Sequence, residues 1–95
     1  MSPATNFSIK QVRKRDGRIV LFNRERITNA VYRAMLATGE GSRERDPLKI
    51  SDRVVKELVK KYPKGGVPNI EEIQDIVEEA LILMDFPKTA KSYIL

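Results

Sequence analysis

The chain has 95 residues, of which 41% are hydrophobic and 33% charged, so its composition fits one small folded domain rather than a disordered segment. Its 18 Lys and Arg residues exceed its 13 Asp and Glu residues and give a formal net charge of +5. That excess is common on ordinary solvated surfaces; it also fits a polyanionic partner, without choosing among nucleotides, nucleic acid and membranes. The sequence has no Cys and no His. A disulfide scaffold, a Cys/His zinc site and catalysis by a Ser or Cys paired with His are therefore excluded within this chain.

Residues 1–8 have no basic segment followed by an apolar core, so we expect a flexible tail and no signal peptide. The longest apolar run, residues 80–84, is far too short to span a bilayer. We therefore expect a cytoplasmic protein with no membrane partner.

An Asp-Gly pair separates two β-prone segments, residues 9–15 and 18–22. A two-residue type I′ turn needs positive φ at both central positions, which Gly17 accepts freely and Asp16 tolerates. The pattern predicts an antiparallel hairpin whose half-charged first strand turns one face to solvent or to a ligand. Val67, much later in the chain, can add a short third strand.

The first helix is predicted to begin at Asn23, whose side chain can cap it, and to end at Gly39. Its core face recurs at helical spacing and comprises Ile27, Ala30, Val31, Ala34, Met35 and Thr38. Asp46 as a cap and Pro47 at the first helical position predict the start of a second helix. The apolar stripe of that helix comprises Ile50, Val54, Leu58 and Val59, flanked by Val55 and Tyr62.

Residues 63–68 contain two Pro and two Gly and end the second helix. Asn69, followed by Glu71 and Glu72, resembles a capping box that starts a third helix. The core face of this helix comprises Ile73, Ile76, Val77, Ala80, Leu81 and Met84. Pro87 opens a last helix, which has no stop signal, so we expect it to be truncated and the chain to be part of a longer polypeptide.

Together these elements predict an α+β, mainly α fold. Four helices bury their apolar stripes against one another, and a small β-hairpin or a three-stranded sheet caps one end of the bundle.

Cations gather on both sides of the predicted turn, at Lys14, Arg15 and Arg18, and Arg26 lies one turn into the first helix. They can clamp a polyphosphate, helped by the backbone donors at the helix start near Asn23. A charged edge strand that prevents aggregation is the simpler explanation, and on this signal alone it is favoured.

The other candidate sites are weaker. Neither glycine-rich segment, 39–42 or 64–66, matches the phosphate-loop pattern. The carboxylates of the third helix are interpreted as a solvated face, because no His accompanies them. We therefore predict no catalytic residue and no metal site. Gln74 borders the apolar stripe and is either an ordinary surface side chain or a hydrogen-bonding partner of a ribose or base.

Three segments resemble the ATP-cone, a regulatory domain of ribonucleotide reductases. They are VRKRDGR with FNRERI at residues 12–18 and 22–27, PNIEEIQDIVE at 68–78 and KTAKSYIL at 88–95. Their order and spacing make the set specific, and the resemblance covers residues 9–95. The tail, residues 1–8, and the closing helix are most similar to those of anaerobic or cobalamin-dependent reductases.

The resemblance implies that ATP or dATP binds between the sheet and the helices. It implies that Lys14 and Arg15 contact the phosphates and that Val12 borders the base pocket. Asn23 and Arg26 would then lie near the phosphates and ribose. Here Arg26 replaces the family's usual Lys and Asn23 a frequent Asp.

By the same resemblance, Ile70 and Gln74 of the third helix face the adenosine. The family's cone is fused to a catalytic domain, and it permits activity with ATP and stops it with dATP by changing subunit association. The implied partners are thus the nucleotide, with Mg²⁺ accompanying a triphosphate, the parent's catalytic domain and other cones in a homo-oligomer. The cone itself is not expected to be an enzyme.

The alternatives differ in class. ATP-cones also occur in a nucleic-acid-binding transcriptional regulator, but there they follow a zinc ribbon, which this chain has no Cys to build. Nucleic acid is therefore a disfavoured partner. A nucleotide-hydrolysing enzyme and a purely structural helical module are further alternatives, distinguished by ATP turnover and by a lack of nucleotide binding.

Overall fold

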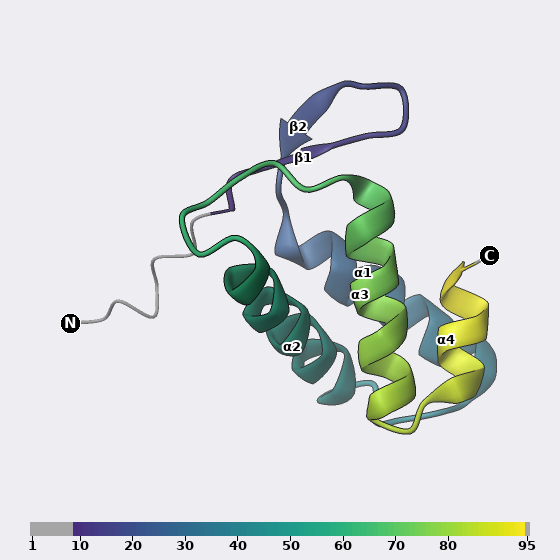
Figure 1. Cartoon of the computed structure of the whole chain (residues 1–95). Helices are drawn as coiled ribbons and strands as arrows, with labels where there is room; N and C mark the ends of the chain where they lie inside the picture. The colour runs from purple at the N-terminus through teal and green to yellow at the C-terminus, as the bar shows by residue number, and fades with distance from the viewer. Residues whose placement is uncertain (1–8, 95) are drawn as a thin grey trace.

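A computed structural model describes residues 9–94 of the chain and the side chains of residues 9–93; the predicted tail, residues 1–8, lies outside this range. Four helices pack together, and a two-stranded antiparallel sheet lies at one end of the bundle (Figure 1). This arrangement confirms the predicted α+β, mainly α fold. The elements in chain order are β1 (Gln11–Arg13), β2 (Ile19–Leu21), α1 (Arg24–Thr38), α2 (Asp46–Lys61), α3 (Ile70–Leu83) and α4 (Pro87–Ile94).

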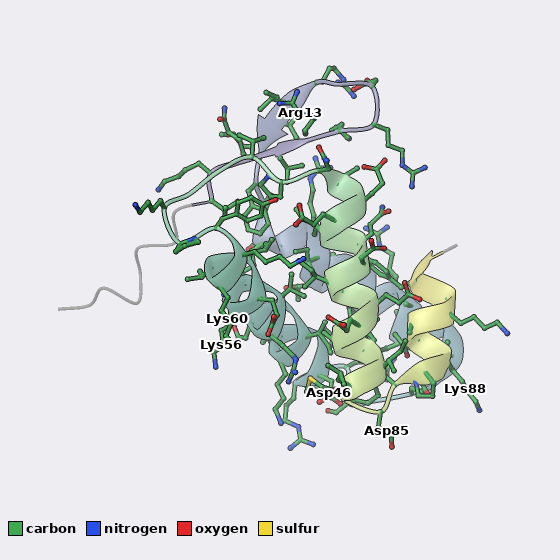
Figure 2. All side chains as sticks on the ribbon, viewed as in Figure 1. Arg13, Asp46, Lys56, Lys60, Asp85 and Lys88 are labelled. Atoms are coloured by element: carbon green, nitrogen blue, oxygen red, sulfur yellow. The ribbon has the colours of Figure 1, made fainter. Side chains whose placement is uncertain are left out.

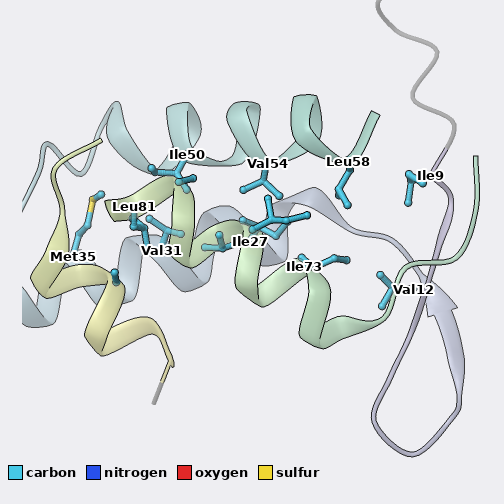
Figure 3. Packing of buried hydrophobic residues seen from close by; sticks show 14 residues of the cluster. Ile9, Val12, Ile27, Val31, Met35, Ile50, Val54, Leu58, Ile73 and Leu81 are labelled. Atoms are coloured by element: carbon cyan, nitrogen blue, oxygen red, sulfur yellow. The ribbon is translucent and has the colours of Figure 1, made fainter. Parts of the chain in front are cut away.

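A single apolar core runs along the bundle and continues under the hairpin (Figure 3). Both α1 and α3 pack against α2 and against α4, so every helix has two neighbours. Ile9 and Val12, only 2% and 5% exposed, extend the core into the hairpin end. Burial of their side chains is what holds the hairpin on the bundle. The helical members are Ile27, Val31, Met35, Ile50, Val54, Leu58, Ile73, Ile76, Val77, Ala80, Leu81 and Ala90.

The hairpin is shorter than predicted and its loop is longer. Val12 pairs with Val20, and the Lys14 N–H donates to the Arg18 carbonyl at 2.8 Å. Residues 15–17 therefore form a three-residue loop, not the two-residue type I′ turn expected from the sequence.

The side chain of Asp16 explains this difference. Gly17 takes the left-handed conformation at φ +89° and donates its N–H to the Lys14 carbonyl at 2.9 Å. Asp16 does not have positive φ, since Asp85 is the non-glycine residue that does so within the described range. Its carboxylate instead accepts hydrogen bonds from the Arg18 backbone N–H at 3.0 Å and from Arg18 Nε at 2.7 Å. An Asp that bonds to the backbone two residues on stabilises its own loop geometry.

The segment before α3 lies beside β1 without becoming a third strand. It makes isolated parallel bridges at Gly66 and Asn69, and the Arg13 N–H donates to the Pro68 carbonyl at 2.9 Å. Pro68 has no N–H with which to continue a ladder. The two-stranded hairpin is thus the correct one of the two predicted alternatives, and a regular strand at Val67 is wrong.

Both predicted ends of α1 are confirmed. Asn23 Oδ1 accepts the Glu25 N–H at 3.0 Å, which satisfies one of the open donors of the first turn. Gly39 ends the helix with its N–H donated to the Met35 carbonyl at 2.8 Å. None of the helices in the described part of the chain combines the length and apolar character needed to cross a membrane.

The predicted starts of α2 and α3 are correct to within one residue, but neither predicted side-chain cap forms. Asp46 lies inside α2, whose cap position is Arg45, and its carboxylate accepts the Ser42 N–H of the preceding loop at 2.6 Å. Asn69 does occupy the cap position of α3 but makes no side-chain capping bond. Its capping-box partner Glu72 accepts a hydrogen bond from the Tyr62 hydroxyl at 2.5 Å instead. In each case a partner from an adjacent segment takes the predicted capping group.

The predicted apolar stripe of α2 is correct except at Val59, which is 40% exposed. Pro47 and Ser51 complete the buried face in its place. Ser51 is buried with its hydroxyl satisfied, since it donates to the Leu48 carbonyl at 3.0 Å and accepts from the Thr28 hydroxyl of α1 at 3.0 Å. This polar link joins α1 and α2 within the apolar interface.

Glu40, just after α1, anchors the start of α4. Its carboxylate accepts the Thr89 N–H at 2.7 Å and the Lys88 N–H at 3.3 Å, and the Thr38 and Thr89 hydroxyls lie 3.0 Å apart. Partial desolvation raises the pKa of Glu40, but the hydrogen bonds from Thr89 and Lys88 and the Lys88 charge together lower it below its usual 4.5. The ionised carboxylate therefore stabilises the docked α4.

We predict that Gly66→Ala lowers the free energy of unfolding by about 1–3 kcal/mol. A Cβ at this position would lie 2.8 Å from Cδ1 of Tyr62. The Tyr62 ring cannot easily retreat, because its hydroxyl is bonded to Glu72. Urea denaturation measures the loss, with Lys64→Ala in the adjoining turn as the control. An unchanged midpoint for Gly66→Ala would show that the close approach is not a constraint.

We also predict that Glu40 makes stability depend on acid pH. Because its pKa is lowered in the folded chain, its contribution is complete above the usual pKa of 4.5 and is lost as pH falls through the lowered value. Thermal unfolding across this window should show a smaller decline for Glu40→Gln than for the unaltered chain. The exposed Glu79→Gln is the control and should decline like the unaltered chain. Equal declines for all three would contradict the role given to Glu40.

Candidate functional site

A cavity of about 440 Å³ opens between the hairpin and the first turns of α1 and α3. Its volume lies in the range of small-molecule sites. The hairpin contributes one wall, the connection from β2 into α1 a second, and the start of α3 a third. The lining residues are Val12, Lys14, Arg18, Val20, Leu21, Phe22, Asn23, Arg26, Ile27, Ile70 and Ile73.

The cavity combines an apolar base with cations. Ile27 and Ile73 of its lining also belong to the buried core, so the base is held rigidly by the bundle. Lys14, Arg18 and Arg26 supply positive charge, and no Asp or Glu is among the lining residues. Such a site suits a ligand with one apolar, planar part and one strongly anionic part.

Two helix N-termini add to this positive potential. The first turn of α1 follows the lining residue Asn23, and α3 begins at the lining residue Ile70. The open N–H groups of a helix start and its dipole favour bound anions. The cations and the helix ends therefore act on the same cavity.

Five of the seven predicted site residues line this one cavity. They come from separate parts of the chain: Val12 and Lys14 from the first strand and its end, Asn23 and Arg26 from the start of α1, and Ile70 from α3.

The other two predicted residues, Arg15 and Gln74, lie outside the lining and contact each other. Arg15 Nη2 donates to Gln74 Oε1 at 3.3 Å, and Arg15 Nε lies 3.1 Å from Glu71 Oε2. Gln74 also borders a second cavity, of about 360 Å³, between α1, α3 and α4. The remaining residues of that cavity are Ala30, Arg33, Ala34, Ser92 and Tyr93.

Arg18 also lines the cavity. The sequence places it among the cations beside the turn, but the residues implied by the family resemblance do not include it. Alternation along the strands is the signal that puts it on the same face as Lys14. Val12 and Lys14 share a face of the hairpin, and their cross-strand partners Val20 and Arg18 lie on that same face. Phe22 was also omitted, because its part in the lining depends on how the hairpin meets α1.

Asp16 forms an ion pair with Arg18 beside the hairpin loop and partly neutralises its charge. Hydrogen bonds from the Arg18 backbone and side chain lower the pKa of Asp16, with a further contribution from the Lys14 charge, and outweigh a small opposing desolvation. Asp16 is therefore ionised at neutral pH. The contact uses Arg18 Nε, whereas a guanidinium has five N–H donors in all, so the side chain can serve a second acceptor.

Residues 10–95 match the family of the ATP cone domain. Since the match spans nearly the whole chain, the chain belongs to the ATP-cone family. ATP-cones are regulatory domains that bind nucleotide effectors, which agrees with a cavity that is apolar at its base and cationic at its wall.

Among the similar curated proteins are ribonucleotide reductases. The chain is 42% identical over 92 residues to the vitamin B12-dependent ribonucleoside-diphosphate reductase of Thermoplasma acidophilum, which covers 92% of this chain and 11% of that protein. It is 33% identical over 90 residues to the ribonucleoside-diphosphate reductase subunit alpha of Chlamydia pneumoniae, covering 86% of this chain and 9% of that protein. The chain thus spans about a tenth of the length of these relatives.

We predict that Asn23→Ala destabilises the domain by about 1 kcal/mol, because the open Glu25 N–H loses its acceptor. Asn23→Ser keeps a capping oxygen and should recover most of the loss. Urea denaturation of the two variants measures the difference. Equal stability of Ala and Ser at this position would mean that the cap does not set the start of α1.

Proposed function

We propose that this domain binds ATP and dATP in the 440 Å³ cavity and that the bound nucleotide sets the overall activity of a ribonucleotide reductase. One observation carries the proposal: an apolar base, three cations and two helix N-termini converge on one cavity that has no lining carboxylate. An adenosine polyphosphate has the matching halves, a planar base and a chain of negative charge.

The cationic wall supports binding of the phosphates. Lys14 supplies a compact charge, and Arg18 and Arg26 supply planar forks that match phosphate oxygens. The N-terminus of α1 adds backbone donors beside Asn23. In this proposal, Arg15 joins the phosphate contacts from the hairpin loop.

The apolar surfaces support binding of the adenosine. Val12 borders the base, and Ile70 packs against the adenosine from α3. Gln74 lies one turn further along α3; its Oε1 accepts from Arg15, and its Nε2 donors are the groups that would reach the nucleoside. The ribose then lies toward Asn23 and Arg26.

Discrimination between ATP and dATP depends on one ribose hydroxyl. A hydrogen bond to that group contributes about 1 kcal/mol, which suits a shift between two arrangements rather than exclusive binding of one nucleotide. The two ligands can switch activity only by stabilising different arrangements to different extents.

We expect Mg²⁺ to accompany the bound triphosphate. Within residues 9–94, no three or more Asp or Glu side chains are grouped closely enough to hold a metal ion. The cavity lining offers no carboxylate either. A Mg²⁺ would therefore be held here by phosphate oxygens and water.

In this proposal the reaction itself belongs to the rest of a larger reductase, and the domain acts as its sensor. The chain has no Cys or His, so it cannot supply a thiol or a nucleophile paired with His. The partners are then the catalytic domain of the parent protein and other copies of the cone, whose association the nucleotide changes. As part of this proposal we place the protein in the cytoplasm, as expected from the sequence.

We predict that calorimetric titration shows binding of ATP and dATP and much weaker binding of GTP. Lys14→Ala should weaken ATP binding about tenfold or more, because it removes a charged phosphate donor from the cavity. Lys56→Ala is the matched control: it removes the same charge from an exposed position on α2, away from the cavity lining (Figure 2).

Two results would contradict the proposal. GTP bound as tightly as ATP would rule out an adenine-selective site. Equal losses of ATP affinity in Lys14→Ala and Lys56→Ala would show that binding depends only on the net charge of the domain. Strong, salt-dependent DNA binding without any effect of nucleotide would favour the alternative of a nucleic-acid-binding regulator.

A further inference from the structure

The side chain of Arg15 joins the hairpin loop to α3 through two side-chain contacts. Its Nε lies 3.1 Å from Glu71 Oε2, and its Nη2 donates to Gln74 Oε1 at 3.3 Å. Residues 15 and 74 are 59 positions apart in the chain. We call these three residues, Arg15, Glu71 and Gln74, the hairpin clasp.

The clasp lies at the edge of the nucleotide cavity. Lys14 precedes Arg15 in the chain and Ile70 precedes Glu71, and both Lys14 and Ile70 line that cavity. Arg15 is thus at the level of the cationic wall, but its guanidinium is directed to α3 rather than into the lining. The acceptors that Arg15 now has are the clasp oxygens; the phosphate oxygens of a nucleotide bound in the cavity would be a second set.

The ion pair of the clasp is well solvated. The side chains of Arg15 and Glu71 are 72% and 54% exposed. Pairs of this kind are weak, because water screens them and two long side chains must be ordered to form them. A polyphosphate offers Arg15 more charge and a bidentate geometry, so it can displace Glu71. A monophosphate offers less charge and a shorter reach.

We propose that Glu71 is a specificity-determining residue that competes with the ligand's phosphates for Arg15. This inference rests on the proposed nucleotide binding and deepens it. Glu71 holds Arg15 on α3 until a ligand with a long phosphate chain takes it over. Glu71 therefore lowers affinity for ATP through Arg15, because the phosphates gain the Arg15 contact only when Arg15 leaves Glu71.

The test is calorimetric titration with ATP and AMP of four proteins: the unaltered chain, Glu71→Gln, Arg15→Ala and the double variant. Glu71→Gln should raise ATP affinity about twofold to fivefold, which is the range set by an exposed ion pair. It should leave AMP affinity unchanged. In the Arg15→Ala background, Glu71→Gln should have no effect on ATP affinity.

Glu79→Gln is the matched control, since it removes one exposed carboxylate from the same helix without touching the clasp. It should leave ATP affinity unchanged. If Glu71→Gln raises ATP affinity equally with and without Arg15, then Glu71 acts by plain repulsion and the inference is wrong. Weaker or unchanged ATP binding in Glu71→Gln overturns it as well.

A second measurement needs no variant to fold. The NMR signal of the Arg15 side-chain N–H in the unaltered chain should shift on addition of ATP and stay in place on addition of AMP. An Arg15 signal that ATP does not move would contradict the exchange of partners. Failure of the unaltered chain to bind any adenine nucleotide would remove the proposed function itself, whereas binding without coupling between Arg15 and Glu71 removes the clasp alone.

Discussion

The cavity exists because the hairpin is docked on the helical bundle. Two core contacts, Ile9 and Val12, bury the inner side of the first strand against the helices, and the bond from the Arg13 N–H to the Pro68 carbonyl ties that strand to the segment before α3. The strand is therefore held between two backbone neighbours, β2 and residues 66–69. Without this docking, the hairpin cations and the two helix N-termini would face separate regions of solvent, and no shared site would form.

Concentrating cations at such a site has an electrostatic cost, and the structure limits it locally. Asp16 pairs with Arg18 and Glu71 pairs with Arg15, so two of the loop cations are partly neutralised by exposed carboxylates. Lys14 and Arg26 lie in a cavity with no lining carboxylate. The hairpin thus combines a positive cavity with two exposed ion pairs, and such pairs are weak enough for an anionic ligand to compete with their carboxylates.

Local signals predicted most of the fold. Helical periodicity gave four helices, and Asn23 was a reliable cap because its acceptor role depends on the next two residues alone. Two of the wrong predictions share one cause: a carboxylate with several nearby donors bonded to one that local sequence rules do not rank first. Asp16 bonded to Arg18 rather than adopting positive φ, and Asp46 bonded to Ser42 rather than capping α2. For the site, residue type and the family resemblance correctly predicted five residues that line one cavity. The contacts of Arg15 with Glu71 and Gln74 were not predictable, because they depend on how the hairpin docks against α3.

The proposed function requires that an adenine nucleotide occupies the cavity between the hairpin, α1 and α3. The most direct measurement is the position of backbone amide NMR signals of the chain during a titration with ATP. We expect saturable shifts that concentrate in residues 12–18, 23–27 and 70–74, with α2 little affected. Shifts that instead concentrate at Arg33 and Tyr93, beside the second cavity, or that never saturate, would contradict it.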